Sequence, residues 1–281
     1  MFCPYNKRGL KMNVLKKLFT AGSLVIALAA PCYAEKLVIA GSTTVLPIAQ
    51  KAAEEYMNAN PDADISVRGG GSGVGIAGII DGTCDIGDAS RSIKEAELDK
   101  AVANGKQPRA HVVAMDGICV IVNPSNPIDA LTKSQVKDIF TGKISNWSQV
   151  GGDNEKIVVV SRDTSSGTFE AFGELALNKA KVRPDALMQA SNQAVATTIA
   201  ETPGAIGYIG LGYLSSSVKA LDIDGVMPSK ETVLSGRYPI GRPLFMYTDG
   251  NPKGMVKDFI DFILSKEGQK MVEQEGFVGL K

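Results

Sequence analysis

The sequence predicts an α/β protein with two lobes, built from mixed sheets with flanking helices and separated by a cleft. Three observations predict this fold. Short apolar segments of strand type alternate along the chain with segments whose apolar residues recur at helical spacing. The chain has 281 residues, which is long for a single hydrophobic core. One apolar segment near its middle, residues 111–122, is long enough for a strand that runs from one lobe into the other.

The first series of strands and helices precedes this long strand. We expect strands at 37–40, 65–67 and 84–87, and helices at 44–58, 73–80 and 93–104. In the first helix, apolar residues recur every three or four positions from Val45 to Tyr56, and Pro61 ends it. Such alternation is typical of mostly parallel strands covered by helices.

A second series follows the long strand, after a break at Pro124 and Pro127. We expect helices at 133–140, 168–178 and 192–201, a strand at 157–160, a return strand at 243–247, and terminal helices at 252–264 and 266–273. The return strand brings the end of the chain back to the first lobe.

These elements predict the domain organisation. The first lobe is expected at residues 35–117, with residues 243–281 returning to it, and the second lobe at residues 118–242. The chain crosses between the lobes twice, so we expect hinges near Asp116 and near Leu244.

The N-terminal segment, residues 1–34, is predicted to be a secretory signal peptide. Basic residues between Lys7 and Lys17 precede an apolar run at 18–30, and small residues follow up to Ala34. The apolar run is shorter than the ~20 residues that a permanent membrane helix needs. We therefore expect a secreted protein. Cys32 raises the alternative of a lipoprotein, which the preceding proline disfavours, and Met12 is an alternative start.

Charge and cysteine content exclude several classes of function. The chain has 30 basic and 30 acidic residues, so loss of the basic leader would leave a net acidic protein, which is a poor candidate for nucleic-acid binding. Cys84 and Cys119 would remain, either as a disulfide or as free buried thiols. His111 is the only histidine and no CxxC pair exists, so we expect no metal site and no cofactor.

Small hydroxylated residues follow four of the predicted strands and precede helices. They lie in GSTT at 41–44, GGGSG at 69–73, DASR at 88–91 and RDTSSGT at 162–168. Each segment places free backbone N–H groups and a hydroxyl at the positive end of a helix, an arrangement that binds anions. Ser and Thr are also common N-caps, so capping explains any one segment alone. Four such segments together indicate one anion site at the carboxyl ends of the strands.

Other motifs indicate less. Gly73 to Gly78 fit GxGxxG, but a lone match is weak support for a dinucleotide site. Ser72 does not fit the GxSxG pattern of a serine hydrolase, because Val74 occupies the last position. We expect His111 to be structural and Trp147 to be a packing anchor, and we expect close helix–strand packing at 204–210.

Taken in order, the motifs resemble those of a known family, the periplasmic phosphate-binding proteins of Pst-type ABC transporters. The resemblance extends from about Lys36 to the C-terminus and rests on GSTTVLP at 41–47, GGGSGVG at 69–75, DIGDASR at 85–91, LTKSQVKDIFTGKISNWSQVGG at 131–152, RDTSSGTFEAF at 162–172 and GAIGYIGLGYL at 204–214. It implies a periplasmic binding protein fold close to type II, a cleft that closes on inorganic phosphate, and no catalysis. It also implies delivery of phosphate to the permease subunits of an ABC transporter. We expect a monomer.

The resemblance further implies which residues bind phosphate. It carries over onto Ser42, Thr43, Ser72, Arg162, Ser166, Gly167 and Thr168, and our full set of candidates adds Thr44, Ser90, Arg91 and Ser165 from the hydroxylated segments, and Asp116. Arg162 would donate charged hydrogen bonds in a solvated cleft, and Gly167 would donate its backbone N–H. Some relatives carry, at the position of Ser90, an aspartate that accepts the proton of hydrogen phosphate. Ser90 could accept that proton, but a hydroxyl can also donate, so it would discriminate poorly between hydrogen phosphate and sulfate. Asp116 and Asp88 are therefore our candidates for the acceptor.

Three alternatives stay open on the sequence. The same fold could bind another tetrahedral oxyanion, such as sulfate, molybdate or tungstate. An enzyme acting on phosphate esters is disfavoured, because we find neither metal ligands nor a nucleophile–base pair. A periplasmic sensor or adhesin could reuse the fold.

Overall fold

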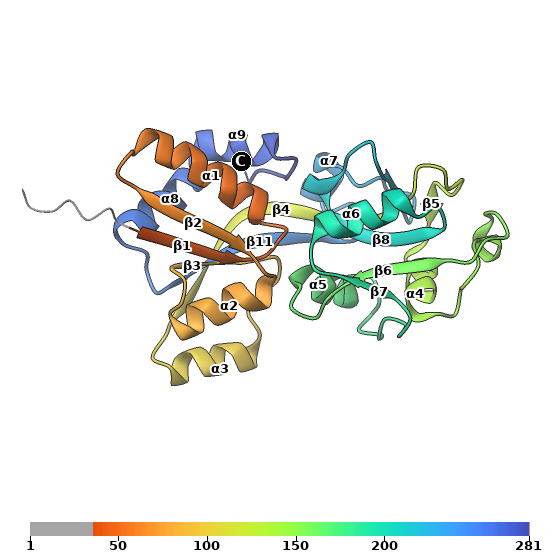
Figure 1. Cartoon of the computed structure of the whole chain (residues 1–281), viewed down its shortest axis with the longest axis horizontal. Helices are drawn as coiled ribbons and strands as arrows, with labels where there is room; N and C mark the ends of the chain where they lie inside the picture. Colours follow the sequence, from red (N-terminus) through yellow and green to blue (C-terminus); the bar gives the residue numbers. More distant parts are fainter. Residues whose placement is uncertain (1–35, 281) are drawn as a thin grey trace, which may run out of the picture. The chain divides into compact units, whose positions relative to one another are not determined.

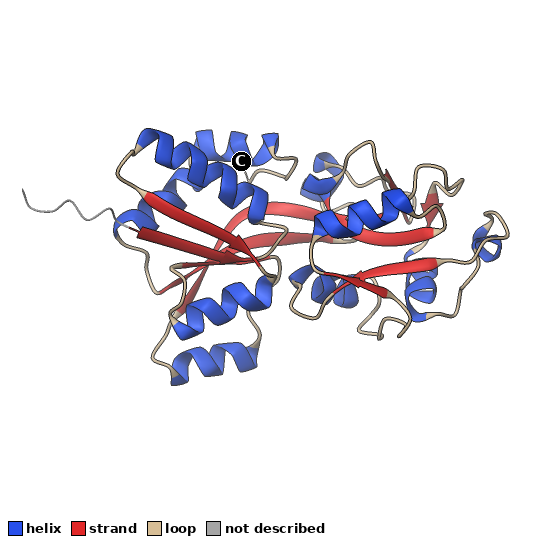
Figure 2. Ribbon diagram, in the orientation of Figure 1, coloured by secondary structure: helices blue, strands red, loops and turns tan. Residues whose placement is uncertain are grey.

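The computed structural model describes residues 36–280, and the predicted leader at residues 1–34 lies outside them. Within the described range, the strands form a mixed sheet of nine strands and a small sheet of two. Figure 2 shows the strands of the larger sheet between helices on both sides. Three clusters of buried apolar side chains divide the fold into two lobes, as the sequence predicts.

The first lobe contains three parallel strands and the helices that follow them. These are β1 (Lys36–Gly41), α1 (Leu46–Ala59), β2 (Asp64–Gly69), α2 (Ser72–Asp81), β3 (Ile86–Ala89) and α3 (Glu95–Ala103). β1 lies between β2 and β3, with Gly41 beside both Gly69 and Asp88. Apolar residues of α1 pack on one face of this sheet and those of α2 on the other. The loops after the three strands therefore lie at one edge of the sheet.

Two long strands connect the lobes. β4 (Pro108–Val122) pairs antiparallel with β11 (Gly241–Asp249) along its first part and with β8 (Ala205–Gly210) along its last five residues. Figure 1 shows β4 and β11 running side by side from one group of elements to the other. The long apolar strand predicted from the sequence is thus confirmed.

The second lobe repeats the arrangement of parallel strands and helices. Its larger elements are α4 (Lys133–Thr141), β6 (Val158–Arg162), α5 (Gly167–Leu175), β7 (Leu187–Gln189) and α6 (Asn192–Glu201). Shorter ones are β5 (Ala130–Leu131), η1 (Trp147–Val150), η2 (Leu211–Tyr213), β9 (Lys219–Ala220), β10 (Asp222–Ile223) and α7 (Lys230–Leu234). β6 pairs in parallel with β7 and β8. Phe172 of α5 stacks on Tyr208 of β8, with ring centroids 3.9 Å apart, and fixes α5 against the sheet.

The last two helices, α8 (Gly254–Leu264) and α9 (Lys266–Gln274), return to the first lobe. Their apolar residues, including Phe259 and Met271, pack in the same cluster as α1 and β1. No helix among residues 36–280 has both the length and the apolar character needed to cross a membrane.

Individual residues also match expectations. Trp147 is buried in the second core, and its Nε1 donates to the carbonyl of Gly204. His111 forms a hydrogen bond between its Nε2 and the hydroxyl of Thr248, on the paired strand β11, at 2.9 Å. A Cβ on Gly207 would lie 2.9 Å from the side chain of Val195, so helix α6 packs closely on β8 as predicted.

The two cysteines, which the sequence leaves open, are free thiols. Cys84 and Cys119 are both buried and unpaired in the structure. Burial raises the pKa of the Cys84 thiol to about 12, and it raises that of Cys119 well above the ordinary value. Both therefore behave as small core residues.

Candidate functional site

The four hydroxylated loops meet where the two lobes face each other. Three of them leave β1, β2 and β3 of the first lobe, and the fourth joins β6 to α5 in the second. The hydroxyls of Thr44 and Thr168 lie 2.9 Å apart across the lobes. A Cβ on Gly167 would lie 2.2 Å from the hydroxyl of Ser72, so only glycine permits this approach. The loops thus form one polar cluster, which the sequence predicts at the carboxyl ends of the strands.

Helix capping explains one of these hydroxyls but not the others. Ser166 is the N-cap of α5, and its Oγ accepts the N–H of Phe169 at 3.2 Å. Ser72 lies inside the first turn of α2 instead, and its Oγ accepts the N–H of Ser90 from another loop at 2.9 Å. Ser42 Oγ accepts the N–H of Thr44 before α1 begins. The hydroxyl of Ser72 is therefore held towards the cluster for a reason other than capping, whereas that of Ser42 forms a local turn with Thr44.

Arg162 is the cation at the centre of the cluster. Its Nε donates to the carbonyl of Gln189 at 3.0 Å, and its Nη2 donates to the carbonyl of Ala190 and to Thr43 Oγ1. The residue is only 1% exposed, so the expectation of a solvated side chain is wrong: the end of β7 with Ala190, together with the first lobe, encloses it. Burial lowers the pKa of Arg162 below its ordinary value.

One nitrogen of this guanidinium has no protein partner. Nη1 of Arg162 is buried and makes no hydrogen bond with any described residue. A buried charged donor without a partner is costly, and a bound anion would satisfy it. This is the arrangement expected at an anion site.

Sequence reasoning missed a second buried cation, Arg242 on β11. Its guanidinium donates to Asp116 Oδ2 at 2.9 Å, to the carbonyl of Ser90 at 3.0 Å and to Thr168 Oγ1 at 3.0 Å. Asp116 and Arg242 lie opposite each other in the β4–β11 register. An arginine directly before the apolar return strand predicted at 243–247 is unusual, and this is the one signal for Arg242 that the sequence offers.

Asp116, our first candidate for a proton acceptor, is already engaged. Its Oδ1 accepts the N–H of Leu211 at 2.9 Å, and its Oδ2 accepts from Arg242. Burial raises the pKa of Asp116, while the attraction of Arg242 opposes that shift. The carboxylate therefore supports Arg242 at the hinge.

Asp88, the second candidate, has both carboxylate oxygens buried and without a hydrogen-bond partner among the described residues. Strand alternation places its side chain on the face of Ile86, which belongs to the first apolar core. Burial raises the pKa of Asp88 well above its ordinary value.

Two other predicted residues are engaged by partners within the protein. The guanidinium of Arg91 forms ion pairs with the carboxylates of Glu97 and Glu170 at 2.7 and 2.9 Å, of which only the pair with Glu97 has hydrogen-bond geometry, so its charge is already engaged. Ser165 joins the lobes: its carbonyl accepts the N–H of Gly73 at 3.0 Å, and its hydroxyl lies within hydrogen-bond distance of the carbonyl of Gly70, at 3.0 Å, and of Asp163 Oδ1, at 2.5 Å.

Two further residues complete the cluster. Asn192, at the start of α6, donates through Nδ2 to Thr44 Oγ1 at 3.0 Å and to Thr43 Oγ1 at 3.2 Å. The hydroxyl of Tyr213 donates to the carbonyl of Thr43. Neither residue stands next to a hydroxylated motif, and the sequence gives no signal for them.

These partners set the direction of the hydroxyl groups. Arginine and amide N–H groups can only donate, so Thr43, Thr44 and Thr168 accept from Arg162, Asn192 and Arg242. A hydroxyl that accepts from such a donor keeps its own proton to donate, although the 2.9 Å bond between Thr44 and Thr168 uses the proton of one of those two residues. The cluster is therefore rich in donors and suited to an oxyanion. Among residues 36–280, no group of three or more His, Cys, Asp or Glu side chains could hold a metal ion.

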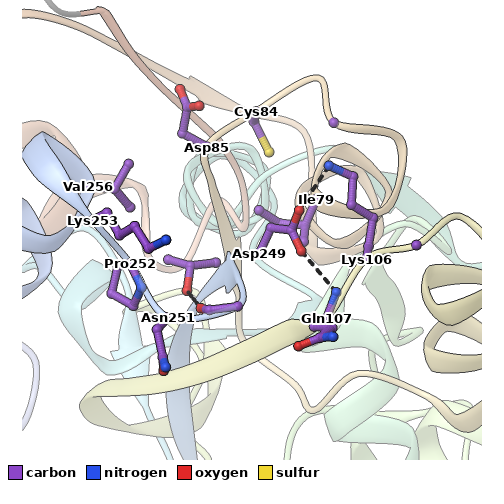
Figure 3. A pocket seen from close by; sticks show the side chains of 14 residues that line it. Ile79, Cys84, Asp85, Lys106, Gln107, Asp249, Asn251, Pro252, Lys253 and Val256 are labelled. Atoms are coloured by element: carbon purple, nitrogen blue, oxygen red, sulfur yellow. Dashed lines mark hydrogen bonds and ion pairs between the residues drawn. The ribbon is translucent and has the colours of Figure 1, made fainter.

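A cavity of about 600 Å³ lies elsewhere in the first lobe and is not part of this cluster (Figure 3). Its charged lining is largely paired, because Asp249 accepts from Lys106 Nζ and from the backbone N–H of Gln107, both at 2.9 Å. The hydroxyl cluster is therefore the better candidate for a functional site.

Comparisons with known proteins agree with this arrangement. A family model described as the PBP superfamily domain matches residues 28–267. The phosphate-binding protein PstS of Bacillus subtilis is 40% identical over 246 residues, covering 86% of this chain and 80% of the relative. PstS of Borreliella burgdorferi is 35% identical, covering 88% of this chain and 91% of the relative. The chain belongs to the PBP superfamily and, within it, to the family of PstS phosphate-binding proteins.

Solved structures give the same result. A protein from Clostridium perfringens, assigned as the substrate-binding protein of a phosphate ABC transporter and solved with bound phosphate, matches with a TM-score of 0.83. It is 36% identical, and the match covers 88% of this chain and 100% of that one. An ABC-type phosphate transport receptor from Vibrio cholerae matches with a TM-score of 0.71 at 32% identity, covering 86% and 99%.

Proposed function

We propose that this protein binds inorganic phosphate between its lobes and delivers it to the permease of an ABC importer. The observation that carries the proposal is the buried Nη1 of Arg162, which lacks a partner among residues 36–280 at the point where hydroxyl donors of both lobes meet. The names of the relatives support the choice of phosphate. A leader at residues 1–34 would export the protein to the periplasm, where it would act as a monomer.

The proposed contacts come from both lobes. The first lobe, residues 35–117 with 243–281, contributes hydroxyls and backbone donors, and the second, residues 118–242, contributes Arg162 together with the hydroxyls and backbone at the start of α5. The donors are Ser42, Thr43, Thr44, Ser72, Ser90, Arg162, Ser166, Gly167 and Thr168, whereas Ser165 joins the lobes, because its hydroxyl and its backbone N–H are engaged within the protein. Arg91 and Asp116 act indirectly in this proposal, because their charged groups are engaged by other side chains.

No catalysis is proposed. The site lacks a nucleophile with a nearby base, since the histidine of the chain, His111, bonds to Thr248 on β11. Binding energy is then used to close the lobes on the ligand rather than to stabilise a transition state.

A fully deprotonated oxyanion such as sulfate is the second candidate. The observation that favours it is the engagement of Asp116 by Arg242 and Leu211, which leaves Ser90 as the group at the position of the expected acceptor. A hydroxyl can donate to sulfate as well as accept from hydrogen phosphate.

Calorimetry on ligand-stripped protein distinguishes the two. We expect tight binding of phosphate and arsenate, and weaker binding of sulfate and molybdate. Preference for sulfate or molybdate over phosphate would contradict the proposal, and a phosphatase assay on the same sample should detect no hydrolysis.

A further inference from the structure

Four charged side chains from both lobes meet beside the hydroxyl cluster. Arg91 and Lys94 follow β3 in the first lobe, Glu97 lies in α3, and Glu170 lies in α5 of the second lobe. Glu170 Oε2 pairs with Arg91 Nε at 2.9 Å and with Lys94 Nζ at 2.8 Å. These two ion pairs therefore join one lobe to the other.

The ion pairs are close in the chain to the proposed anion donors. Arg91 directly follows Ser90, and Glu170 comes two residues after Thr168. A cavity of about 370 Å³ is lined by Arg91 and Glu170 and also by Ser90 and Arg242. The charged cluster thus borders the cleft, and a change in the position of α5 would separate its members.

The side chain of Arg91 is oriented by a residue of its own lobe. Glu97 belongs to the same lobe as Arg91 and holds its guanidinium with two hydrogen bonds, at 2.7 and 2.8 Å. Glu97 also accepts the backbone N–H of Lys94 at 2.9 Å. The side chain of Arg91 is 8% exposed and that of Glu170 19%, so salt screens this pair less than a surface pair. Glu97 therefore holds the guanidinium of Arg91 in the orientation in which it pairs with Glu170.

We propose that Arg91, Lys94 and Glu170 form an ionic latch that lengthens the lifetime of the closed, ligand-bound state without touching the ligand. The proposal rests on the proposed function. Because the latch pairs join the two lobes, they stabilise the closed state and add nothing to a state in which the lobes are apart. The observed affinity depends on how favourable closure is, so the latch raises affinity by slowing release.

The test is the rate of phosphate release from Glu170→Gln, measured by stopped flow against the wild type. Loss of both pairs should make release about five- to thirtyfold faster, with little change in the association rate. The matched control is Glu174→Gln, one turn later on α5, where the carboxylate is exposed and has no ion pair in the structure. The control should release phosphate at the wild-type rate.

Ionic strength and stability separate a latch from a merely structural residue. The difference between Glu170→Gln and the wild type should shrink in part at high salt, because screening weakens mainly the pair with Lys94, whose side chain is 54% exposed. The melting temperature of the ligand-free variant should equal that of the wild type. An unchanged release rate, or a fall in ligand-free stability that accounts for the faster release, would overturn the latch.

Failure of the latch can be distinguished from failure of the proposed function. If wild-type protein does not bind phosphate, the proposed function fails, and the same release measurement is made with the oxyanion that does bind. If no oxyanion binds, both proposals fail. If phosphate binds and Glu170→Gln behaves as Glu174→Gln does, only the latch fails.

Discussion

Arg162 is the residue on which the proposed site depends most. Arg162→Ala should weaken phosphate binding by about 10- to 150-fold, because charge-assisted hydrogen bonds are worth ~1.5–3 kcal/mol each. The variant should also be less stable, since the carbonyls of Gln189 and Ala190 lose their donor. Calorimetry and thermal unfolding measure the two effects. Arg237→Ala, which removes an exposed arginine, is the control and should change neither.

Asp88 should make stability depend on pH. Its pKa is raised in the folded protein, whereas in the unfolded chain it is ~3.9. Below the unfolded pKa, both states carry the proton. As the pH rises from there towards the folded pKa, the unfolded state ionises first, so the free energy of unfolding falls by up to ~1.4 kcal/mol per pH unit.

Asp88→Asn should therefore flatten the dependence of stability on pH above about pH 4. The slope is the informative quantity, because a buried amide brings a desolvation cost of its own that does not vary with pH. Chemical unfolding at a series of pH values measures it. Asp62→Asn, at an exposed turn, is the control; equal slopes for Asp88→Asn and the wild type would show that Asp88 keeps its ordinary behaviour.

At the scale of elements, Ser166 combines two roles in α5. Ser166→Ala should lower the free energy of unfolding by ~0.5–2 kcal/mol through loss of the N-cap. It should also weaken phosphate binding by ~1 kcal/mol through loss of a donor. Ser265→Ala removes the N-cap of α9, far from the hydroxyl cluster in the chain, and should lower stability alone. Loss of stability without loss of affinity in Ser166→Ala would leave this residue as a helix cap only.

The elements that the sequence predicted share a strong pattern. α1 and α6 have apolar residues at helical spacing, and β4 is a long apolar run, so their existence followed from periodicity. Strands of two or three residues, such as β5 and β7, are too short for any alternation. The segment of β8 is rich in glycine and was interpreted only as a place of close packing.

The site residues that the sequence predicted lie in local motifs, whereas those that it missed depend on contacts between distant segments. Its hydroxyl loops are local motifs, so the sequence predicted that they converge. Arg242 was missed because its role depends on pairing with Asp116, 126 positions away, and strand register cannot be deduced from either segment alone. Arg91 was predicted as a ligand because it adjoins Ser90; its partner Glu170 is supplied by the other lobe.

At the scale of the whole molecule, the contacts between lobes describe a closed form. The hydrogen bonds between Arg162 and Thr43 and between Thr168 and Thr44, and the ion pair between Glu170 and Arg91, each join the second lobe to the first. Within the described residues, the chain crosses between the two lobes only in β4 and β11. Any opening of the lobes therefore requires these two strands to bend near Asp116 and Leu244. A hinge motion about these strands is the movement this connectivity favours.

Phosphate should therefore make the protein more compact. In the absence of ligand, the unpaired Nη1 of Arg162 disfavours closure, because its desolvation is not compensated. Bound phosphate supplies the missing acceptor and shifts the population towards the closed form. Small-angle scattering on ligand-stripped protein should give a larger radius of gyration without phosphate than at saturation, and Glu170→Gln should need more phosphate to reach the same decrease. Superimposable curves with and without saturating phosphate would contradict closure and indicate a site that is already formed in the free protein.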